Sequence, residues 1–196
     1  VTQFENLYKF VNEQKLPVLV IGEGTNIVPK DYFEGIVIKP TFNKVQYNTN
    51  DSTVSVGSSV NWHSFVKEMI KNKIYGFENL SLIPGSVGAS PIQNIGAYGM
   101  EVKDSIEKVC AIELESGKTK NFNNKQCKFK YRESIFKNEC KNKYVITKVI
   151  FKLSKKHLNI TSYGDVEKEL KNLNLSINPK NISDTIIKIR NKTVSY

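Results

Sequence analysis

The sequence is poor in the residue types that mark several large classes of protein. It has three cysteines and only two arginines in 196 residues. The cysteines, Cys110, Cys127 and Cys140, form no Cys-x-x-Cys pair, so we expect neither a disulfide framework nor a metal site. No stretch approaches the roughly 18 apolar residues of a membrane span, and no signal peptide opens the sequence. These absences favour a globular protein of the reducing cytoplasm.

Charge is distributed unevenly along the chain. Residues 1–100 contain eight lysines and eight acidic residues and carry no net charge. Residues 101–196 contain 21 basic and 11 acidic residues, so they carry the whole net charge of +10. This charge raises the hypothesis of a nucleic-acid-binding module. Against it, the lysines are not interleaved with aromatic residues and match no nucleic-acid-binding motif.

The spacing of apolar residues predicts an α+β fold. Apolar residues three and four positions apart predict helices. Ser183 is predicted to cap the last of these helices. Helices are predicted at 2–11, 62–70, 165–173 and 184–190. Strands are predicted, from continuous or alternating apolar runs, at 17–21, 35–39, 44–47, 53–57, 109–114, 118–122 and 144–153.

The segment 82–99 follows neither period and is unusually long for a connection in a compact domain. Its four glycines allow a ligand to approach the backbone closely and expose N–H groups to an anion such as a pyrophosphate. Gln93 and Asn94 can both donate and accept hydrogen bonds at the edge of a heterocycle. The segment carries no charge, so backbone dipoles would have to bind the anion. Loops of this kind are commonly functional, and a structural Ω-loop is the alternative.

Two shorter motifs accompany this loop. Residues 22–26, Gly-Glu-Gly-Thr-Asn, follow an apolar strand, where phosphate-binding turns often lie, although the sequence is neither Gly-x-Gly-x-x-Gly nor a Walker loop. Arg132 lies in the segment Tyr131-Arg132-Glu133-Ser134. In a chain that otherwise uses lysine, this arginine suggests bidentate recognition of a carboxylate or phosphate. A surface ion pair with Glu133 or a neighbouring residue is the alternative.

Together these segments resemble the UDP-N-acetylenolpyruvoylglucosamine reductase family, also called UDP-N-acetylmuramate dehydrogenases. The most specific string is P-G-S-V-G-A-S-P-I-Q-N-I-G-A-Y-G at 84–99. It is accompanied by L-V-I-G-E-G-T-N at 19–26, G-F-E-N-L at 76–80 and Y-R-E-S-I-F-K at 131–137. The order and approximate spacing of these segments match the family from about residue 16 to residue 153, and more loosely to Arg190.

The resemblance implies an FAD-binding fold of the vanillyl-alcohol-oxidase (PCMH) type. Two small α+β subdomains are expected at 1–57 and 58–155, followed at 156–196 by the start of a substrate domain that is mostly missing. The resemblance also implies FAD and NADPH as cofactors and UDP-N-acetylglucosamine enolpyruvate as the substrate, in peptidoglycan synthesis. A cytoplasmic monomer is expected, with no nucleic-acid or membrane partner.

The same resemblance assigns site residues. Arg132 would stabilise the carboxylate of the substrate and is the expected catalytic residue. Substrate binding would involve Tyr98, Tyr131, Tyr163 and Arg190. The residues expected to bind FAD are Gly22, Glu23, Gly24, Thr25, Asn26, Pro84, Gly85, Gly88, Ala89, Ser90, Gln93, Asn94, Ile95 and Gly96.

Some motifs of the family do not occur in these 196 residues. They are the amino-terminal N-T-F segment, the G-S-F-F-K-N-P-type segment with the proton-donating serine, and a catalytic glutamate that follows much later. We therefore expect this chain alone not to complete the reduction. A flavin-binding protein that lacks reductase activity is the alternative.

Overall fold

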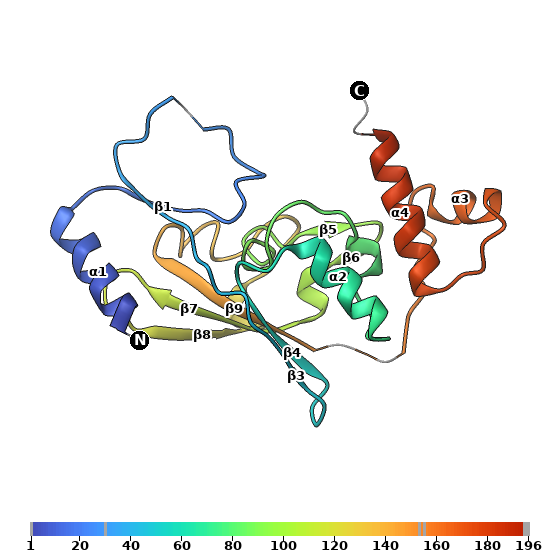
Figure 1. Cartoon of the computed structure of the whole chain (residues 1–196), viewed down its shortest axis with the longest axis horizontal. Coiled ribbons are helices and arrows are strands. Elements are labelled where there is room, and N and C mark those ends of the chain that lie inside the picture. Colours follow the sequence, from blue (N-terminus) through green and yellow to red (C-terminus); the bar gives the residue numbers. More distant parts are fainter. Residues whose placement is uncertain (1, 30, 153, 155, 194–196) are drawn as a thin grey trace.

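The computed structural model describes residues 2–29, 31–152, 154 and 156–193. Helix α1 (Thr2–Gln14) lies at one end of the molecule and helix α4 (Pro179–Thr193) lies toward the other (Figure 1). Strands β1 (Val18–Val20) and β2 (Ile36–Ile38) form a parallel pair. Helix α1 covers this pair through a small apolar cluster that includes Val11, Ile38 and Val145.

The centre of the molecule is a five-stranded antiparallel sheet with the order β3-β4-β9-β7-β8. Its strands are β3 (Val45–Asn48), β4 (Thr53–Gly57), β7 (Ile106–Glu113), β8 (Thr119–Asn123) and β9 (Tyr144–Lys152). The predicted alternation of β9 holds from Val149 to Lys152. A register shift at Thr147 breaks it, so Ile146 lies in the main core with Val149 and Phe151, while Val145 packs in the smaller cluster beside α1. Val149 pairs with Val56 on one side and Val109 on the other, so a buried apolar row crosses three strands.

Helix α2 (Trp62–Lys71) packs on the buried face of this sheet. Asn61 caps the helix, because its side-chain oxygen accepts the Ser64 N–H at 2.9 Å. The apolar side of α2 meets Phe77 and Phe151, and the Trp62 ring lies 5.3 Å from the Phe77 ring, edge to face. Since the Trp62 indole also donates to the Leu80 carbonyl at 2.9 Å, the helix holds the start of the long glycine-rich loop.

Helices α3 (Val166–Asn172) and α4 form a separate apolar cluster. The predicted cap at Ser183 is wrong. The helix begins at Pro179, and Asn178 caps it by accepting the Asn181 N–H at 2.9 Å. Ser183 lies inside the helix, is 3% exposed and shares a 2.7 Å hydrogen bond with the Ser81 hydroxyl.

The α+β prediction is confirmed. The predicted helices and strands occur, β4 with the predicted bounds and the others with one or both ends shifted. The sequence did not indicate the short strands β5 (Gly96–Ala97) and β6 (Met100–Glu101), which pair with each other. It also did not indicate the 3₁₀ turns η1 (Glu78–Leu80), η2 (Val87–Ala89), η3 (Val102–Asp104) and η4 (Lys125–Cys127). The predicted end of the last strand, Leu153, is outside the described residues.

The subdomain boundaries remain predictions. The boundary at residue 57 is not a break in hydrogen bonding, because β3 and β4, which precede it, belong to the same sheet as β7, β8 and β9. The boundary at Lys155 falls outside the described residues. Within the described ranges, no helix has the length and apolar character needed to span a bilayer.

Candidate functional site

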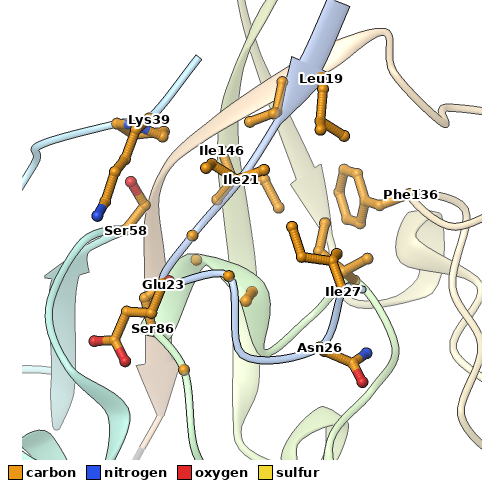
Figure 2. A pocket seen from close by; sticks show the side chains of 18 of the residues that line it. Leu19, Ile21, Glu23, Asn26, Ile27, Lys39, Ser58, Ser86, Phe136 and Ile146 are labelled. Atoms are coloured by element: carbon orange, nitrogen blue, oxygen red, sulfur yellow. The ribbon is translucent and has the colours of Figure 1, made fainter. Parts of the chain in front are cut away.

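A cavity of about 400 Å³ lies between the 22–26 turn, the glycine-rich loop and the end of the sheet near β9 (Figure 2). This volume is within the range of small-molecule and cofactor sites. Residues from five separate parts of the chain line it. They include Leu19, Ile21, Gly22, Glu23, Gly24, Thr25, Asn26, Ile27, Lys39, Ser58, Gly85, Ser86, Gly88, Ala89, Gln93, Phe136, Lys137, Cys140, Tyr144 and Ile146.

The two glycine-rich segments lie against each other at one end of this cavity. A Cβ atom on Gly22 would lie 2.7 Å from the Ser86 hydroxyl oxygen, so only glycine allows this approach without a shift. Gly85 has a φ of +112°, and a Cβ atom there would lie 3.2 Å from the Thr25 hydroxyl oxygen. The close approach therefore depends on glycine in both segments.

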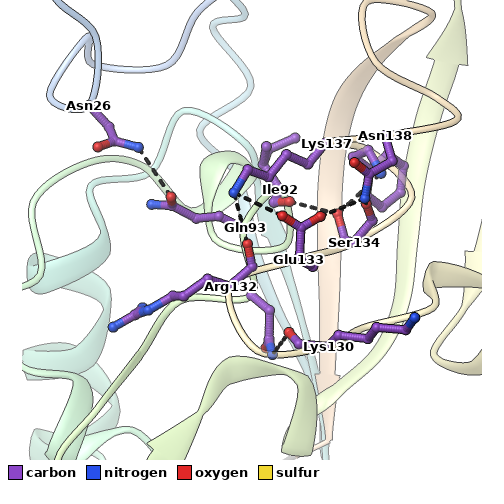
Figure 3. Close-up of polar contacts among 11 residues, drawn as sticks. Asn26, Ile92, Gln93, Lys130, Arg132, Glu133, Ser134, Lys137 and Asn138 are labelled. Atoms are coloured by element: carbon purple, nitrogen blue, oxygen red, sulfur yellow. Dashed lines mark hydrogen bonds and ion pairs between the residues drawn. The ribbon is translucent and has the colours of Figure 1, made fainter.

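A hydrogen bond also joins the two segments, since the Asn26 side-chain amide donates to the Gln93 side-chain oxygen at 3.1 Å (Figure 3). Among the residues that the structure describes, the backbone N–H groups of 22–26, Gly85 and Ser86 donate no hydrogen bond. These residues all line the cavity. Unpaired N–H groups gathered at two turns form a site suited to an anion such as a phosphate.

Ser58 and Lys39 add polar groups to the same end of the cavity. Ser58 is 4% exposed, yet its hydroxyl has no hydrogen-bond partner in the described part of the chain. Its backbone is fixed, because the Ser58 carbonyl accepts the Gly88 N–H at 2.9 Å. In Figure 2 the ammonium group of Lys39 points toward Ser58. A buried hydroxyl without a partner is unfavourable, so a polar ligand group is the partner that this position suits.

The other end of the cavity is apolar. It draws on β1, the segment that follows β1, the segment before β9 and β9 itself, and its side chains face one another in Figure 2. Such a surface suits a flat ring system, which gains from the burial of apolar area and from contact with an aromatic side chain. The side chains are those of Leu19, Ile21, Ile27, Phe136 and Ile146.

The position of the glycine-rich loop depends on His63, a residue of α2. Its Nδ1 atom accepts the Leu82 backbone N–H at 3.0 Å. Burial lowers the pKa of His63, and the charge of Lys67 lowers it further. The neutral imidazole is therefore favoured, as this hydrogen bond requires, since a protonated Nδ1 cannot accept.

Nine of the fourteen residues predicted to bind the cofactor line the cavity: Gly22, Glu23, Gly24, Thr25, Asn26, Gly85, Gly88, Ala89 and Gln93. Pro84, Ser90, Asn94, Ile95 and Gly96 are not part of its lining. The Ser90 hydroxyl donates to a backbone carbonyl, Ile95 belongs to the core, and the side chain of Asn94 makes three hydrogen bonds inside the protein. The side chains of these three residues therefore contact other parts of the protein.

Arg132 lies outside the cavity lining, on a turn beside strand β5. One Nη atom donates to the Gly96 carbonyl at 2.6 Å, and the guanidinium lies 5.7 Å from the Tyr131 ring centre. The alternative of an ion pair with Glu133 is not realised, because Glu133 pairs with Lys137 at 3.2 Å (Figure 3). No described acidic residue forms an ion pair with Arg132. Its charge is therefore not balanced by an acidic side chain of the described residues.

Two of the four residues predicted to bind substrate lie together. The loop that carries Tyr163 contacts the turn after Tyr98, since a Cβ atom on Gly99 would lie 3.3 Å from the Cβ atom of Tyr163. Asn79 holds both segments: its amide donates to the carbonyls of Tyr98 and Ile160, at 2.8 and 2.9 Å. Tyr131 is 80% exposed, and Arg190 is partly buried on helix α4.

Comparisons with known proteins agree with this geometry. A family model described as an FAD binding domain matches residues 1–123, more than half of the chain. This chain belongs to the FAD-binding domain family. The match includes both glycine-rich segments and Ser58, so the polar end of the cavity lies inside the matched region.

Curated relatives of this FAD-binding domain carry the name that the sequence motifs indicate, which confirms the resemblance. A UDP-N-acetylenolpyruvoylglucosamine reductase from Flavobacterium johnsoniae is 44% identical over 184 residues, which cover 91% of the chain and 54% of the relative. The protein of that name from Bdellovibrio bacteriovorus is 41% identical over 180 residues, covering 90% and 54%. The chain thus spans about half the length of the curated relatives it matches.

Solved structures confirm the expected fold. UDP-N-acetylenolpyruvylglucosamine reductase (MurB) from Thermus caldophilus aligns with a TM-score of 0.63 at 19% identity, over 96% of this chain and 59% of that one. Alkyldihydroxyacetonephosphate synthase aligns with a TM-score of 0.57 at 14% identity, over 78% and 32%. The FAD-binding domain therefore has the α+β fold of the vanillyl-alcohol-oxidase type.

Ser58, Lys39, Phe136 and Ile146 line the cavity but were not identified from the sequence. Ser58 directly follows strand β4, and Ile146 is one of several alternating apolar residues in β9. Neither position carries a local signal. Only the antiparallel pairing of β4 with β9 brings them to the same end of the sheet.

Proposed function

We propose that the cavity binds FAD and that this chain forms the FAD-binding part of a reductase of UDP-N-acetylglucosamine enolpyruvate. The reaction would use NADPH, yield UDP-N-acetylmuramate and belong to peptidoglycan synthesis in the cytoplasm. The observation that carries the proposal is the set of unpaired N–H groups at two adjoining glycine turns, beside the unpartnered Ser58 hydroxyl. They lie in a region that matches an FAD binding domain.

The residues present suit FAD in charge and in polarity. The turns at 22–26 and 85–86 would hold the pyrophosphate through backbone N–H groups, with Ser58 donating its hydroxyl proton and Lys39 balancing part of the charge. The apolar end around Phe136 and Ile146 would accept one of the two ring systems. The close approach of Gly22 to Ser86 keeps the turns together.

Arg132 would bind the carboxylate of the enolpyruvyl group. One of its five N–H donors is used by the Gly96 carbonyl, so a planar pair of donors can still meet a carboxylate. FAD would supply hydride transfer from NADPH to the enolpyruvyl double bond. Negative charge then grows beside the carboxylate, and a fixed guanidinium lowers its energy there. Tyr98, Tyr131, Tyr163 and Arg190 are the proposed contacts for the rest of the substrate.

The first experiment is a titration of the purified chain with FAD, followed by its visible absorption and by quenching of flavin fluorescence. We expect a flavin band that remains with the protein through gel filtration, at the elution volume of a monomer. A protein fraction without a flavin band after gel filtration from excess FAD would overturn the proposal. DNA serves as a negative control ligand, since a strongly salt-dependent affinity for it would support a basic nucleic-acid-binding module instead.

Two matched glycine variants test the site itself. Gly24 and Gly164 have φ values of +74° and +67°, and a Cβ atom added at either position would meet no other atom within 3.4 Å. Alanine should therefore destabilise both variants by a similar amount, about 1 kcal/mol, because of the left-handed backbone. Only Gly24→Ala should weaken FAD binding, by roughly tenfold, since it shifts the N–H groups of the turn. Equal FAD affinity in the two variants would contradict the assignment.

The role of Arg132 is tested separately. Arg132→Lys should leave the flavin band intact and weaken binding of UDP-N-acetylglucosamine enolpyruvate, because an ammonium group cannot form the planar double hydrogen bond. Loss of flavin in this variant would show that Arg132 serves the cofactor instead. Bleaching of the bound flavin by NADPH, followed by reoxidation with the substrate, would then show whether the chain completes the reaction.

A further inference from the structure

We propose that Asn94 is a positioning residue for Arg132 and makes no direct contact with the cofactor. The structure assigns it this role through a partly buried set of hydrogen bonds that joins the glycine-rich loop to the turn carrying Arg132. The functional part of the inference rests on the proposed function, which gives Arg132 its substrate carboxylate. The structural part concerns this chain alone.

All the hydrogens of the Asn94 amide are used inside the protein. Asn94 is fully buried, and its amide nitrogen donates to the Lys130 carbonyl at 3.0 Å and to a carboxylate oxygen of Glu101 at 2.9 Å. Its side-chain oxygen accepts the Lys103 backbone N–H at 3.0 Å. The Lys103 ammonium also pairs with the Glu101 carboxylate, which balances the charge of this partly exposed group. No donor of this side chain remains for a cofactor.

The turn that Asn94 holds determines where Arg132 lies. Lys130 and Glu133 exchange both backbone hydrogen bonds, at 3.0 and 3.1 Å, and Arg132 sits between them with a φ of +56°. An arginine in the left-handed region is uncommon and needs support from its surroundings. The Lys130 carbonyl accepts both the Glu133 N–H and the Asn94 amide, so its two lone pairs tie the turn to the loop.

Two further contacts connect the same loop and turn. The Arg132 guanidinium donates to the Gly96 carbonyl at 2.6 Å, and the Ser134 hydroxyl donates to the Ile92 carbonyl at 2.6 Å. Asn94 lies between Ile92 and Gly96 in the sequence, so its side chain bonds at the middle of this junction. Its loss should release the turn while the glycine turns at 22–26 and 85–86 keep their own contact.

The sequence offers a direct observation of this effect, because the chain contains only two arginines, Arg132 and Arg190. Arginine labelled with ¹⁵N gives two side-chain signals, and Arg190→Lys identifies which belongs to Arg132. In the parent chain we expect a slowly rotating guanidinium at Arg132, because it is bonded to the Gly96 carbonyl. Asn94→Asp keeps the shape and removes both donors, so the Arg132 signal should move toward that of free arginine.

Asn124→Asp is the matched control. The Asn124 amide also donates to two backbone carbonyls, those of Lys103 and Ile106, both at 2.8 Å, but neither belongs to the Arg132 turn. The control should lower stability and leave the Arg132 signal unchanged. If Asn94→Asp does not fold, as judged by the fluorescence of the single tryptophan, the shorter side chain of Asn94→Ser takes its place.

A double-mutant cycle connects the signal to binding in the FAD-loaded chain. We expect Asn94→Asp to weaken binding of UDP-N-acetylglucosamine enolpyruvate by roughly tenfold where Arg132 is present and hardly at all in the Arg132→Ala background. The affinity for FAD should change less than threefold. An Arg132 signal that is unchanged in Asn94→Asp, or a loss of FAD affinity as large as that of Gly24→Ala, would overturn the proposal. Failure of the parent chain to bind FAD would instead count against the proposed function, because the NMR comparison does not need FAD.

Discussion

The unpartnered hydroxyl of Ser58 allows a prediction in which stability and ligand binding change in opposite directions. A hydroxyl that is buried without a hydrogen bond destabilises the folded state by about 1–3 kcal/mol. Ser58→Ala removes that hydroxyl and leaves the backbone bond from Gly88 in place. Removal of the oxygen also leaves a small void, which offsets part of this gain. The net expectation is that the variant without ligand is more stable than the parent chain by about 1 kcal/mol.

The same change should weaken binding of FAD. A hydrogen bond to a charged group contributes about 1.5–3 kcal/mol, and this contribution is absent when the hydroxyl is absent. Since about 1.4 kcal/mol corresponds to a factor of ten, Ser58→Ala should raise the dissociation constant of FAD roughly tenfold to a hundredfold. Stability without ligand would thus rise while the stabilisation gained from FAD would fall.

Thr185 provides the control, because its hydroxyl is also buried without a partner in the described part of the chain, on helix α4 and outside the cavity lining. Thr185→Val should stabilise the chain to a similar degree and leave FAD affinity unchanged. Urea unfolding, followed by the buried Trp62, measures stability, and flavin fluorescence measures affinity. If Ser58→Ala destabilises the chain without ligand, or binds FAD as tightly as the parent chain, the assignment of Ser58 to the ligand is refuted.

The remaining predictions concern pH, thiols and packing. Because the folded state lowers the pKa of His63, the free energy of unfolding should decrease as pH falls from about 6.5 through that lower pKa. Urea unfolding of His63→Gln should show a smaller decrease. An equal pH dependence in the variant and the parent chain would contradict this prediction. Burial raises the pKa of Cys127 to about 12, so iodoacetamide should label the cavity residue Cys140 before Cys127. FAD should slow the labelling of Cys140, and mass spectrometry identifies the labelled cysteine. Earlier labelling of Cys127 would be contrary evidence. Gly88→Ala places a Cβ atom 2.5 Å from the Cβ atom of Ser58, so thermal unfolding should show a loss of stability of about 1–3 kcal/mol. An unchanged stability would show that the backbone of the loop shifts to accommodate the added atom.

Some parts of the candidate site were predictable because their signals are local. The 22–26 turn and the 82–99 loop were identified from glycine and from the absence of any period, and both line the cavity. Asn94 shows the limit of this reasoning. A carboxamide in such a loop can contact a heterocycle or the protein itself, and only its surroundings decide, here Lys130, Glu101 and Lys103.

The helix boundaries show the same limit. Ser183 is a residue type that caps helices, but Asn178 lies five residues earlier and precedes a proline, which favours the first helical position. Both positions are compatible with local propensity. The burial of Ser183 against Ser81 on another segment settled the choice, and a sequence pattern does not encode that contact.

The sequence by itself determined the α+β class, the two glycine-rich segments and the family, because these depend on local backbone preferences and on specific strings. The tertiary structure alone decided which groups face the ligand. It brought Ser58, Phe136 and Ile146 to one cavity, left the Ser58 hydroxyl without a partner among the described residues and turned the Asn94 amide inward. The physical reason is that the direction of a side chain depends on pairing between strands such as β4 and β9, which lie about ninety residues apart in the sequence.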